Sequence, residues 1–125
     1  MLEVILALGL IPILALSLFF LFSRSLRLRR QADDVTRGTE LARLELESIR
    51  RLPVSQIPAA SSFDGGAGTP PSAGFPPPPY PKVQQDRQDY TLRVDTASEH
   101  GCRAVRVQVS WLGSHNLSLE TLINP

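Results

Sequence analysis

The most pronounced pattern in the chain is a run of apolar residues at its start. Residues 1–22 read MLEVILALGLIPILALSLFFLF, and no charged residue lies between Val4 and Phe22. At a helical rise of about 1.5 Å per residue, this uncharged run covers roughly 28 Å, close to the thickness of a bilayer's hydrocarbon core. A helix that is apolar on every side must be buried on every side. The pattern therefore predicts a transmembrane helix over residues 1–23.

A cleaved signal peptide is the alternative for this segment. A signal peptide begins with basic residues, has a shorter apolar core and ends in a small-residue cleavage site. Here no Lys or Arg precedes the apolar run, and the run ends in the sequence FSRS at residues 22–25. We therefore expect a membrane helix that is retained.

A second helical pattern, amphipathic this time, covers residues 31–52. Apolar residues recur at spacings of seven, four and three, and charged residues, Glu45 among them, occupy the remaining positions. Such a stripe is more often the core-facing side of a helix than a coiled-coil seam. The predicted stripe comprises Val35, Leu41, Ala42, Leu44, Leu46, Ile49 and Leu52.

The two helical patterns can form one continuous helix. No proline lies between Ile13 and Leu52, so a helix of about 50 residues, roughly 75 Å long, is possible. Gly38 would weaken it locally by about 1 kcal/mol relative to alanine. Pro53 ends it, because the residue before a proline is driven out of helical geometry. Residues 24–53 are thus expected to continue the membrane helix.

Residues 54–89 have no usable periodicity and hold most of the prolines of the chain. Proline favours polyproline II and glycine favours flexibility, so we expect a loop or linker here. Phe63, Phe75 and Tyr80 are candidates for pinning parts of it to a surface. The PPPPY sequence ending at Tyr80 also resembles a ligand for proline-binding domains, although a spacer is the more frequent role of such sequences.

Residues 90–125 change to the alternating pattern of half-buried β-strands. The clearest strand is RAVRVQVSW, in which valines and a tryptophan alternate with small, polar or charged residues. It is expected to form a hairpin with the strand after it, and the strand before it can pair alongside. The predicted strands are Tyr90–Asp95, Arg103–Trp111 and Leu117–Ile123, joined by a connection at 96–102 and a turn at 112–116.

These elements predict an α+β fold. Three strands alone would leave one apolar face of the sheet in water, and the amphipathic helix has a stripe that needs a partner. We expect a long N-terminal helix, membrane-spanning in its front half, whose back half packs on a small antiparallel sheet of about three strands.

Composition narrows the classes of function. The chain has 125 residues and a formal net charge of +1, which gives no reason to expect a nucleic-acid partner. Cys102 is the single cysteine, so an intrachain disulfide is impossible. Without the apolar segment, about a hundred residues remain, enough for one small domain at most.

No catalytic constellation is visible in the sequence. His100 and His115 lie in predicted loops without the i, i+4 spacing of a helical metal pair, so we expect surface histidines. We expect Cys102 to be a half-buried structural thiol, since residues as close in sequence as His100 and Cys102 rarely hold triad geometry. No Gly-rich loop joins a strand to a helix, as a nucleotide site requires. We therefore expect neither enzymatic activity nor a metal or cofactor.

Four arginines follow the apolar run and form a basic collar. At a membrane surface, arginines reach lipid phosphates and fix the depth of the helix. By the positive-inside rule, they would also keep the C-terminal part of the chain in the cytoplasm. The collar consists of Arg24, Arg27, Arg29 and Arg30.

Glu3 is the acidic residue at the start of the apolar run. It can lie at the membrane surface, where a carboxylate is tolerated. Ionisable groups in membrane segments otherwise suggest a functional role, because only pairing offsets their desolvation. If this helix leaves the bilayer and packs among identical helices, Glu3 requires a cation, and the amino terminus of a neighbouring subunit is the nearest candidate.

Three stretches of the sequence carry a resemblance to a known family. Residues 2–10 (LEVILALGL) are similar to the motif that opens the long apolar helix of type IV pilins and type II secretion pseudopilins. Residues 39–53 (TELARLELESIRRLP) look like the helix end of V-type minor pilins and I-type minor pseudopilins. Residues 105–111 (VRVQVSW), followed by residues 118–122 (SLETL), are similar to the last hairpin of that group.

The chain departs from the family pattern at its start. Family precursors have a short basic leader, a glycine before the cleavage point and usually a phenylalanine after it, whereas here Met1 stands two residues before Glu3. Either the start is placed too late or this member lacks processing, and the fit of the remaining pattern favours the misplaced start. A basic leader would place positive charge on the cytoplasmic side of the helix. Pro12 also lies nearer the front than the family's helix proline.

The resemblance implies a minor pilin or pseudopilin, a structural subunit of the bacterial inner membrane with its C-terminal domain on the periplasmic side. It would assemble through its N-terminal helix into a type IV pilus or a type II secretion pseudopilus. Its partners would be other pilin or pseudopilin subunits and the inner-membrane assembly platform. The alternative from another class is a single-pass membrane adaptor, in which the arginine collar stays cytoplasmic and the proline-rich segment recruits a partner.

Overall fold

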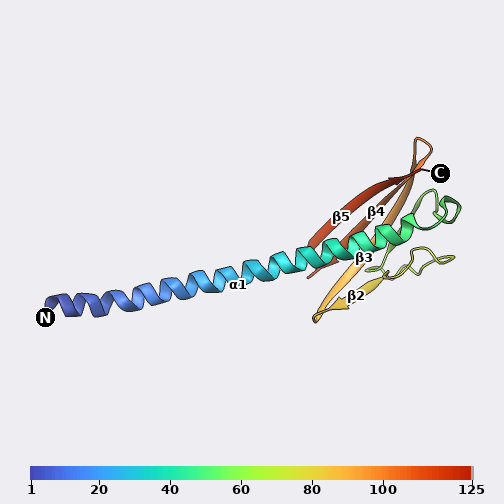
Figure 1. Cartoon of the computed structure of the whole chain (residues 1–125). Coiled ribbons are helices and arrows are strands. Elements are labelled where there is room, and N and C mark those ends of the chain that lie inside the picture. The colour runs from blue at the N-terminus through green and yellow to red at the C-terminus, as the bar shows by residue number, and fades with distance from the viewer. Residues whose placement is uncertain (125) are drawn as a thin grey trace. The chain divides into compact units, whose positions relative to one another are not determined.

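A computed structural model describes residues 1–124 of the chain. A long helix is followed by a short 3-10 helix and an antiparallel sheet (Figure 1). The predicted α+β class, with a long N-terminal helix and a small antiparallel sheet, is therefore confirmed. The elements are α1 (Leu2–Arg50), η1 (Val54–Gln56), β1 (Ser61–Asp64), β2 (Lys82–Gln85), β3 (Gln88–Glu99), β4 (Cys102–Trp111) and β5 (His115–Ile123).

Helix α1 is continuous over 49 residues, including Pro12. The backbone N–H of Leu52 donates to the carbonyl of Ile49 at 3.0 Å, which tightens the last turn, and Pro53 then has an extended backbone. The chain divides into two compact units, and α1 contributes to both. In the first unit, residues 1–34, the chain is helical from Leu2 onward. The second unit contains the remainder of α1 and the strands.

Within residues 1–124 the sheet has five strands, two more than the alternating pattern predicts. Strand β3 pairs with β4 along one side and with β1 and β2 in succession along the other. Strand β5 pairs with β4 and forms the opposite edge, so the predicted hairpin is confirmed. Strands β1 and β2 are four residues each, too short for a period of two to stand out in the sequence.

The connection predicted at 96–102 is wrong for most of its length. The β3–β4 ladder continues from Thr96, opposite Val105, to Glu99, opposite Cys102. Only His100 and Gly101 form the turn, both with positive φ (50° and 82°), as in the type I′ turns of two-residue hairpins. This end of β3 is exposed, so its residues are polar or small and do not show the alternating pattern of a strand. Backbone hydrogen bonds to β4 stabilise it instead.

The back half of α1 covers the inner face of the sheet within the second unit. Its buried positions lie on one stripe, because each is three or four residues from at least one other buried position. The alternating residues of β3 and β4 supply the other side of the core, as predicted for the strands. The core contains Leu41, Ala42, Ile49, Ile57, Phe63, Phe75, Tyr80, Tyr90, Leu92, Val94, Val105, Val107, Val109 and Trp111.

The predicted apolar stripe of the helix is partly wrong. Leu41, Ala42 and Ile49 are buried, but Val35 and Leu44 are 45% and 54% exposed. At about 100° per residue, Leu44 points well away from the centre of the buried stripe, and Val35 lies nearly one turn before the first buried residue. The position at the centre of the stripe is instead Glu45, which the sequence pattern assigned to the solvated face.

Gly38 lies where α1 meets the end of β4. A Cβ atom at this position would be 3.0 Å from Cζ3 of Trp111. Trp111 is almost fully buried and its ring lies 5.8 Å from that of Tyr90. The glycine that weakens the helix locally therefore makes room for the largest side chain of the core.

Part of the segment 54–89 belongs to the core. Phe63 packs edge-on against Phe75 and Tyr80, with ring centroids 5.6 and 6.4 Å away, and all three are buried. The Tyr80 hydroxyl donates to the carbonyl of Thr69 at 2.5 Å. The three aromatic residues thus attach the proline-rich segment to the sheet, as their chemistry suggested.

Candidate functional site

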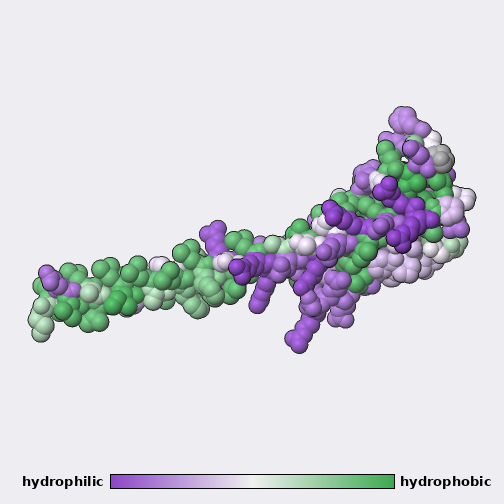
Figure 2. Space-filling model, in the orientation of Figure 1, coloured by the Kyte–Doolittle hydropathy of each residue, from purple (hydrophilic) through white to green (hydrophobic). Residues whose placement is uncertain are grey.

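The first unit presents an apolar helix surface with no covering from the described residues. Between Leu2 and Phe22, the large apolar side chains are 56–76% exposed. In Figure 2, hydrophobic residues cover most of the visible side of this part of the helix, up to the point where charged residues begin. By length and composition, α1 could cross a membrane. A surface of this kind requires lipid or other apolar helices around it.

Glu3 is placed in the first turn of α1 and is exposed. Its carboxylate lies near the positive end of the helix dipole, an arrangement worth about 0.3–1 kcal/mol at an exposed site. Among residues 1–124 it forms no ion pair. A cationic partner for Glu3 would therefore have to come from another molecule.

The arginine collar surrounds the helix. Arg24, Arg27, Arg29 and Arg30 are all exposed and helical. At about 100° per residue, their Cβ atoms leave the helix axis in four well-separated directions. A ring of this kind is suited to contact lipid phosphates on every side of the helix and does not form a one-sided binding patch.

Glu45 is the buried polar group that the sequence did not reveal. It has no exposed surface, and neither carboxyl oxygen has a hydrogen-bond partner among the described residues. Burial raises the pKa of Glu45 to about 8, and the nearby backbone of Tyr80 opposes the rise only in part. The site is thus a carboxyl group that favours its protonated form at neutral pH.

A signal for Glu45 was present in the helical spacing. Glu45 lies four residues after Leu41, three after Ala42 and four before Ile49, which places it on the same face as these three. The hydropathy of glutamate concealed it, because charged residues are almost never fully buried without a partner.

The histidines and the cysteine differ in their positions and contacts. His100 lies in the β3–β4 turn, and His115 stacks on Trp111 with ring centroids 6.0 Å apart. Cys102 is half-buried, and its thiol donates to the side-chain carbonyl of Asn124 at 2.8 Å. No cluster of three or more His, Cys, Asp or Glu side chains suited to a metal occurs in residues 1–124.

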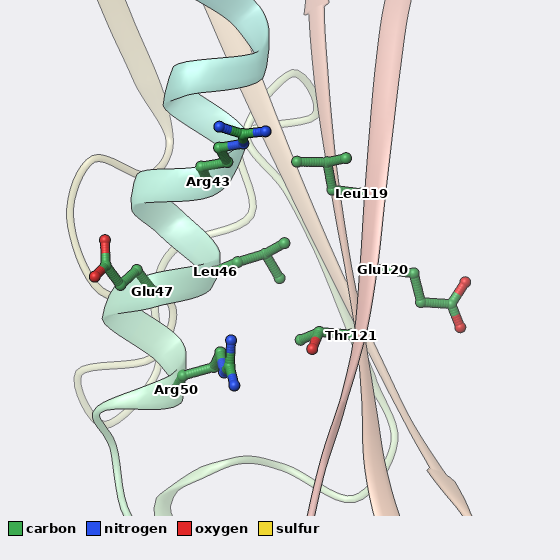
Figure 3. Close-up of a pocket in the computed structure, with 7 residues that line it drawn as sticks. All are labelled: Arg43, Leu46, Glu47, Arg50, Leu119, Glu120 and Thr121. Atoms are coloured by element: carbon green, nitrogen blue, oxygen red, sulfur yellow. The ribbon is translucent and has the colours of Figure 1, made fainter.

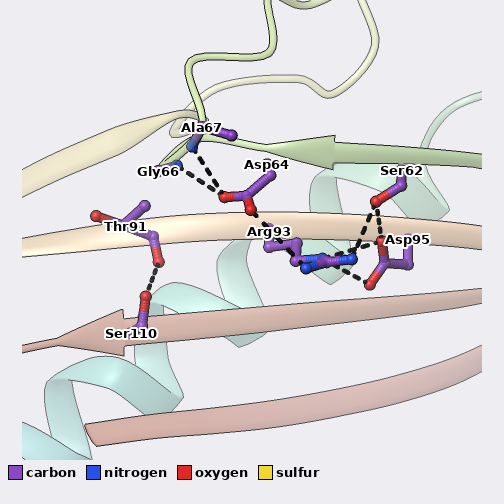
Figure 4. Close-up of polar contacts among 8 residues, drawn as sticks. All are labelled: Ser62, Asp64, Gly66, Ala67, Thr91, Arg93, Asp95 and Ser110. Atoms are coloured by element: carbon purple, nitrogen blue, oxygen red, sulfur yellow. Dashed lines mark hydrogen bonds and ion pairs between the residues drawn. The ribbon is translucent and has the colours of Figure 1, made fainter. Parts of the chain in front are cut away.

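A polar network on the outer face of the sheet joins β1 to β3 (Figure 4). Arg93 lies between two carboxylates, 3.2 Å from Asp95 and 3.8 Å from Asp64. Ser62 donates to Asp95 at 2.5 Å, and Asp64 accepts from the backbone N–H of Gly66 at 2.8 Å. These groups satisfy one another, so the network holds the short strand β1 and leaves no charge directed at a ligand.

The PPPPY segment does not present its tyrosine. Tyr80 is 8% exposed, and Phe75 and Pro76 at the other end of the segment are also buried. Proline-rich ligands are read through exposed side chains in a polyproline II conformation. The structure thus uses the ends of this segment for packing.

The arrangement of a long apolar N-terminal helix on a small antiparallel sheet is compatible with a pilin-like fold. The chain matches no protein-family model, and no curated protein or solved structure shows significant similarity to it.

Proposed function

We propose that this chain is a minor pilin or pseudopilin, a non-enzymatic subunit assembled from the bacterial inner membrane into a type IV pilus or a type II secretion pseudopilus. The observation that carries the proposal is the uncovered apolar surface of α1 with a carboxylate, Glu3, in its first turn. Its partners would be other pilin or pseudopilin subunits and the inner-membrane assembly platform. The sheet domain would lie on the periplasmic side of the membrane.

The physical basis of assembly is an exchange of surroundings for α1. In the membrane, lipid chains cover the apolar side chains from Leu2 to Phe22. In a filament, neighbouring helices would cover them instead. Glu3 would then be removed from water, and an uncompensated buried carboxylate costs several kcal/mol. Pairing with the amino terminus of a neighbouring subunit offsets that cost and sets the axial position of the helix.

The substitution Glu3→Ala tests this role. We expect membrane insertion to be unchanged, because alanine is apolar, and incorporation into filaments to fall at least tenfold, because the ion pair is lost. Incorporation is measured by immunoblotting sheared filaments against the membrane fraction. Asp33→Ala, which removes an exposed carboxylate farther along α1, is the matched control and should be incorporated normally. Normal incorporation of Glu3→Ala would contradict the proposal.

A single-pass membrane adaptor is the second candidate, and the arginine collar favours it. Arginines that directly follow a membrane helix usually remain in the cytoplasm, which would place the sheet there as well. Against this candidate stands the burial of Tyr80, which an adaptor that uses the PPPPY sequence would need to expose. The two candidates place the sheet on opposite sides of the membrane.

A further inference from the structure

Strand β5 leaves one edge of the sheet uncovered. It pairs with β4 on one side only. In an antiparallel ladder, every second residue of an edge strand directs its N–H and C=O away from its neighbour. No backbone group in residues 1–124 pairs with that outer side of β5. Nine residues of edge strand are therefore open to a further strand.

The opposite edge of the sheet is protected. There β1 and β2 are four residues each, and β2 begins with a lysine, Lys82. Proteins usually guard sheet edges with short strands, prolines, bulges or lysines. Strand β5 has no proline or lysine, and its one acidic residue, Glu120, is bonded to Arg106 at 3.0 Å. An edge of this length without such guards is typical of a pairing site.

A groove of about 390 Å³ runs between α1 and β5 (Figure 3). Leu46 and Leu119 point toward each other across it. The side chain of Glu120 points away from the helix, so Glu120 lines the groove through its backbone. The groove thus combines an apolar floor with the backbone of an open strand.

Two arginines on the helix side of the groove have no carboxylate partner among the described residues. Arg43 and Arg50 line it, are exposed, and form no ion pair with any residue that the structure describes. Glu47, the other charged helix residue of the groove, lies 3.5 Å from Arg51. Arg43 and Arg50 are seven positions apart, or about 10 Å along the helix. A strand places residues four positions apart at about 13 Å, within reach of two flexible arginines.

We propose that β5 pairs with an extended segment of another protein whose groove-facing residues are two carboxylates flanking one apolar side chain. The backbone of the segment would extend the sheet, its apolar residue would contact Leu46 and Leu119, and its carboxylates would pair with Arg43 and Arg50.

The charge also excludes a second copy of the same strand as the occupant. On the helix side β5 offers apolar residues, a threonine and a histidine, because Glu120 points to the other face. Pairing of two β5 strands would bring four groove arginines together, and neither strand would contribute a carboxylate to the groove side. The docking site works without Glu3 and without filament assembly, so it goes beyond the function proposed above.

The test uses the full chain in detergent micelles and fluorescent peptides titrated to 1 mM. The probe is Thr-Glu-Thr-Val-Thr-Glu-Thr, and Thr-Arg-Thr-Val-Thr-Arg-Thr is the control with reversed charge. A third peptide has the probe sequence with N-methyl groups on alternate amides, which prevents strand pairing. The protein variant is Arg43→Glu/Arg50→Glu. Its matched control is Lys82→Glu/Arg87→Glu, which changes the net charge equally at exposed basic residues outside the groove.

We expect the probe to bind the wild type and the control variant at least tenfold more tightly than the arginine peptide. The preference should invert in Arg43→Glu/Arg50→Glu, and the N-methylated peptide should not bind. Amide hydrogen exchange should slow in residues 115–123 when the probe is bound. Absence of binding at 1 mM, equal binding of the two charged peptides, retained binding of the N-methylated peptide or self-association through β5 would each overturn the proposal. None of these readouts depends on filament assembly.

Discussion

The carboxyl group of Glu45 is buried against the sheet, where its surroundings penalise the charged form. With no hydrogen-bond partner among the described residues, its ionisation is opposed mainly by desolvation. The folded state therefore binds a proton at Glu45 that the unfolded chain releases at a lower pH. Residue chemistry alone would place this group at the surface, and only the packing of its neighbours explains its position.

This burial makes stability depend on pH. Because the pKa of Glu45 rises from 4.5 to about 8 on folding, stability from this group is unaffected below pH 4.5 and falls as the pH rises toward 8. Each unit of pKa corresponds to about 1.4 kcal/mol, so the free energy of unfolding falls by an amount on the order of 5 kcal/mol. We expect Glu45→Gln to remove most of this slope and to stabilise the fold at pH 8, as measured by chemical denaturation of the full chain in detergent.

Glu40→Gln is the control for that experiment, because Glu40 is an exposed carboxylate on the same helix. It should retain the slope of the wild type. If Glu45→Gln showed the same pH dependence as the wild type, the ionisation of Glu45 would not be the cause.

At the scale of elements, α1 changes its surroundings along its length. Its first part carries apolar residues on all sides and is exposed, while its last part presents one buried stripe to the sheet. Gly38 begins that stripe, since it is the first buried residue of α1 and contacts Trp111. The fit between helix and sheet at this end depends on the absence of a side chain.

Enlarging this glycine should loosen the packing between α1 and β4. We expect Gly38→Leu to destabilise the fold by roughly 1–3 kcal/mol, because the new side chain must displace the ring of Trp111. The change should also shift the emission of Trp111, the only tryptophan of the chain. Thermal unfolding followed by tryptophan fluorescence measures both effects.

Gly9→Leu is the matched control, since a Cβ at Gly9 has no described atom within 4 Å and the residue is also helical. Its unfolding temperature should equal that of the wild type. Equal stability of Gly38→Leu and the wild type would show that Trp111 moves aside without cost.

At the scale of the whole molecule, the chain combines a helix that needs apolar surroundings with a domain that has its own core. The helix needs such surroundings because the side chains of residues 2–22 are exposed, whereas the back half of α1 and the sheet form a core of their own. The side of the membrane on which the domain lies then separates a filament subunit from an adaptor. This property is measurable without knowledge of any partner.

Topology can be measured with one thiol in the β4–β5 turn. In the full chain, Cys102→Ser removes the native thiol and Ser114→Cys places a new one at an exposed turn position. For a pilin-like subunit, we expect a membrane-impermeant maleimide to label this thiol in intact spheroplasts. Labelling only after lysis would place the sheet in the cytoplasm and would contradict the proposal of a pilin-like subunit. Cys102→Ser alone, which lacks thiols, controls for background.

Much of the fold could be predicted from local patterns. The apolar run, the absence of proline before Pro53 and the alternation in β4 are each properties of adjacent residues, so they predict a helix and strands without any knowledge of packing. The candidate residues Glu3 and Arg24–Arg30 were also visible, because they interrupt or end a run of apolar residues. The structure places them at exposed helical positions.

The other features of the fold and of the candidate sites depend on tertiary contacts. The short strands β1 and β2 form because each pairs with β3. The four residues of β1 do not indicate by themselves that they pair with residues some thirty positions later in the chain. Glu45 is a core residue because the apolar residues one turn before and one turn after it pack on the sheet, and their burial outweighs the preference of a carboxyl group for water. The groove beside β5 likewise arises from where α1 crosses the sheet. The sequence by itself determined which elements form, since those follow from local sterics and hydrophobic period, and the tertiary contacts determined which faces are buried and which edge stays open.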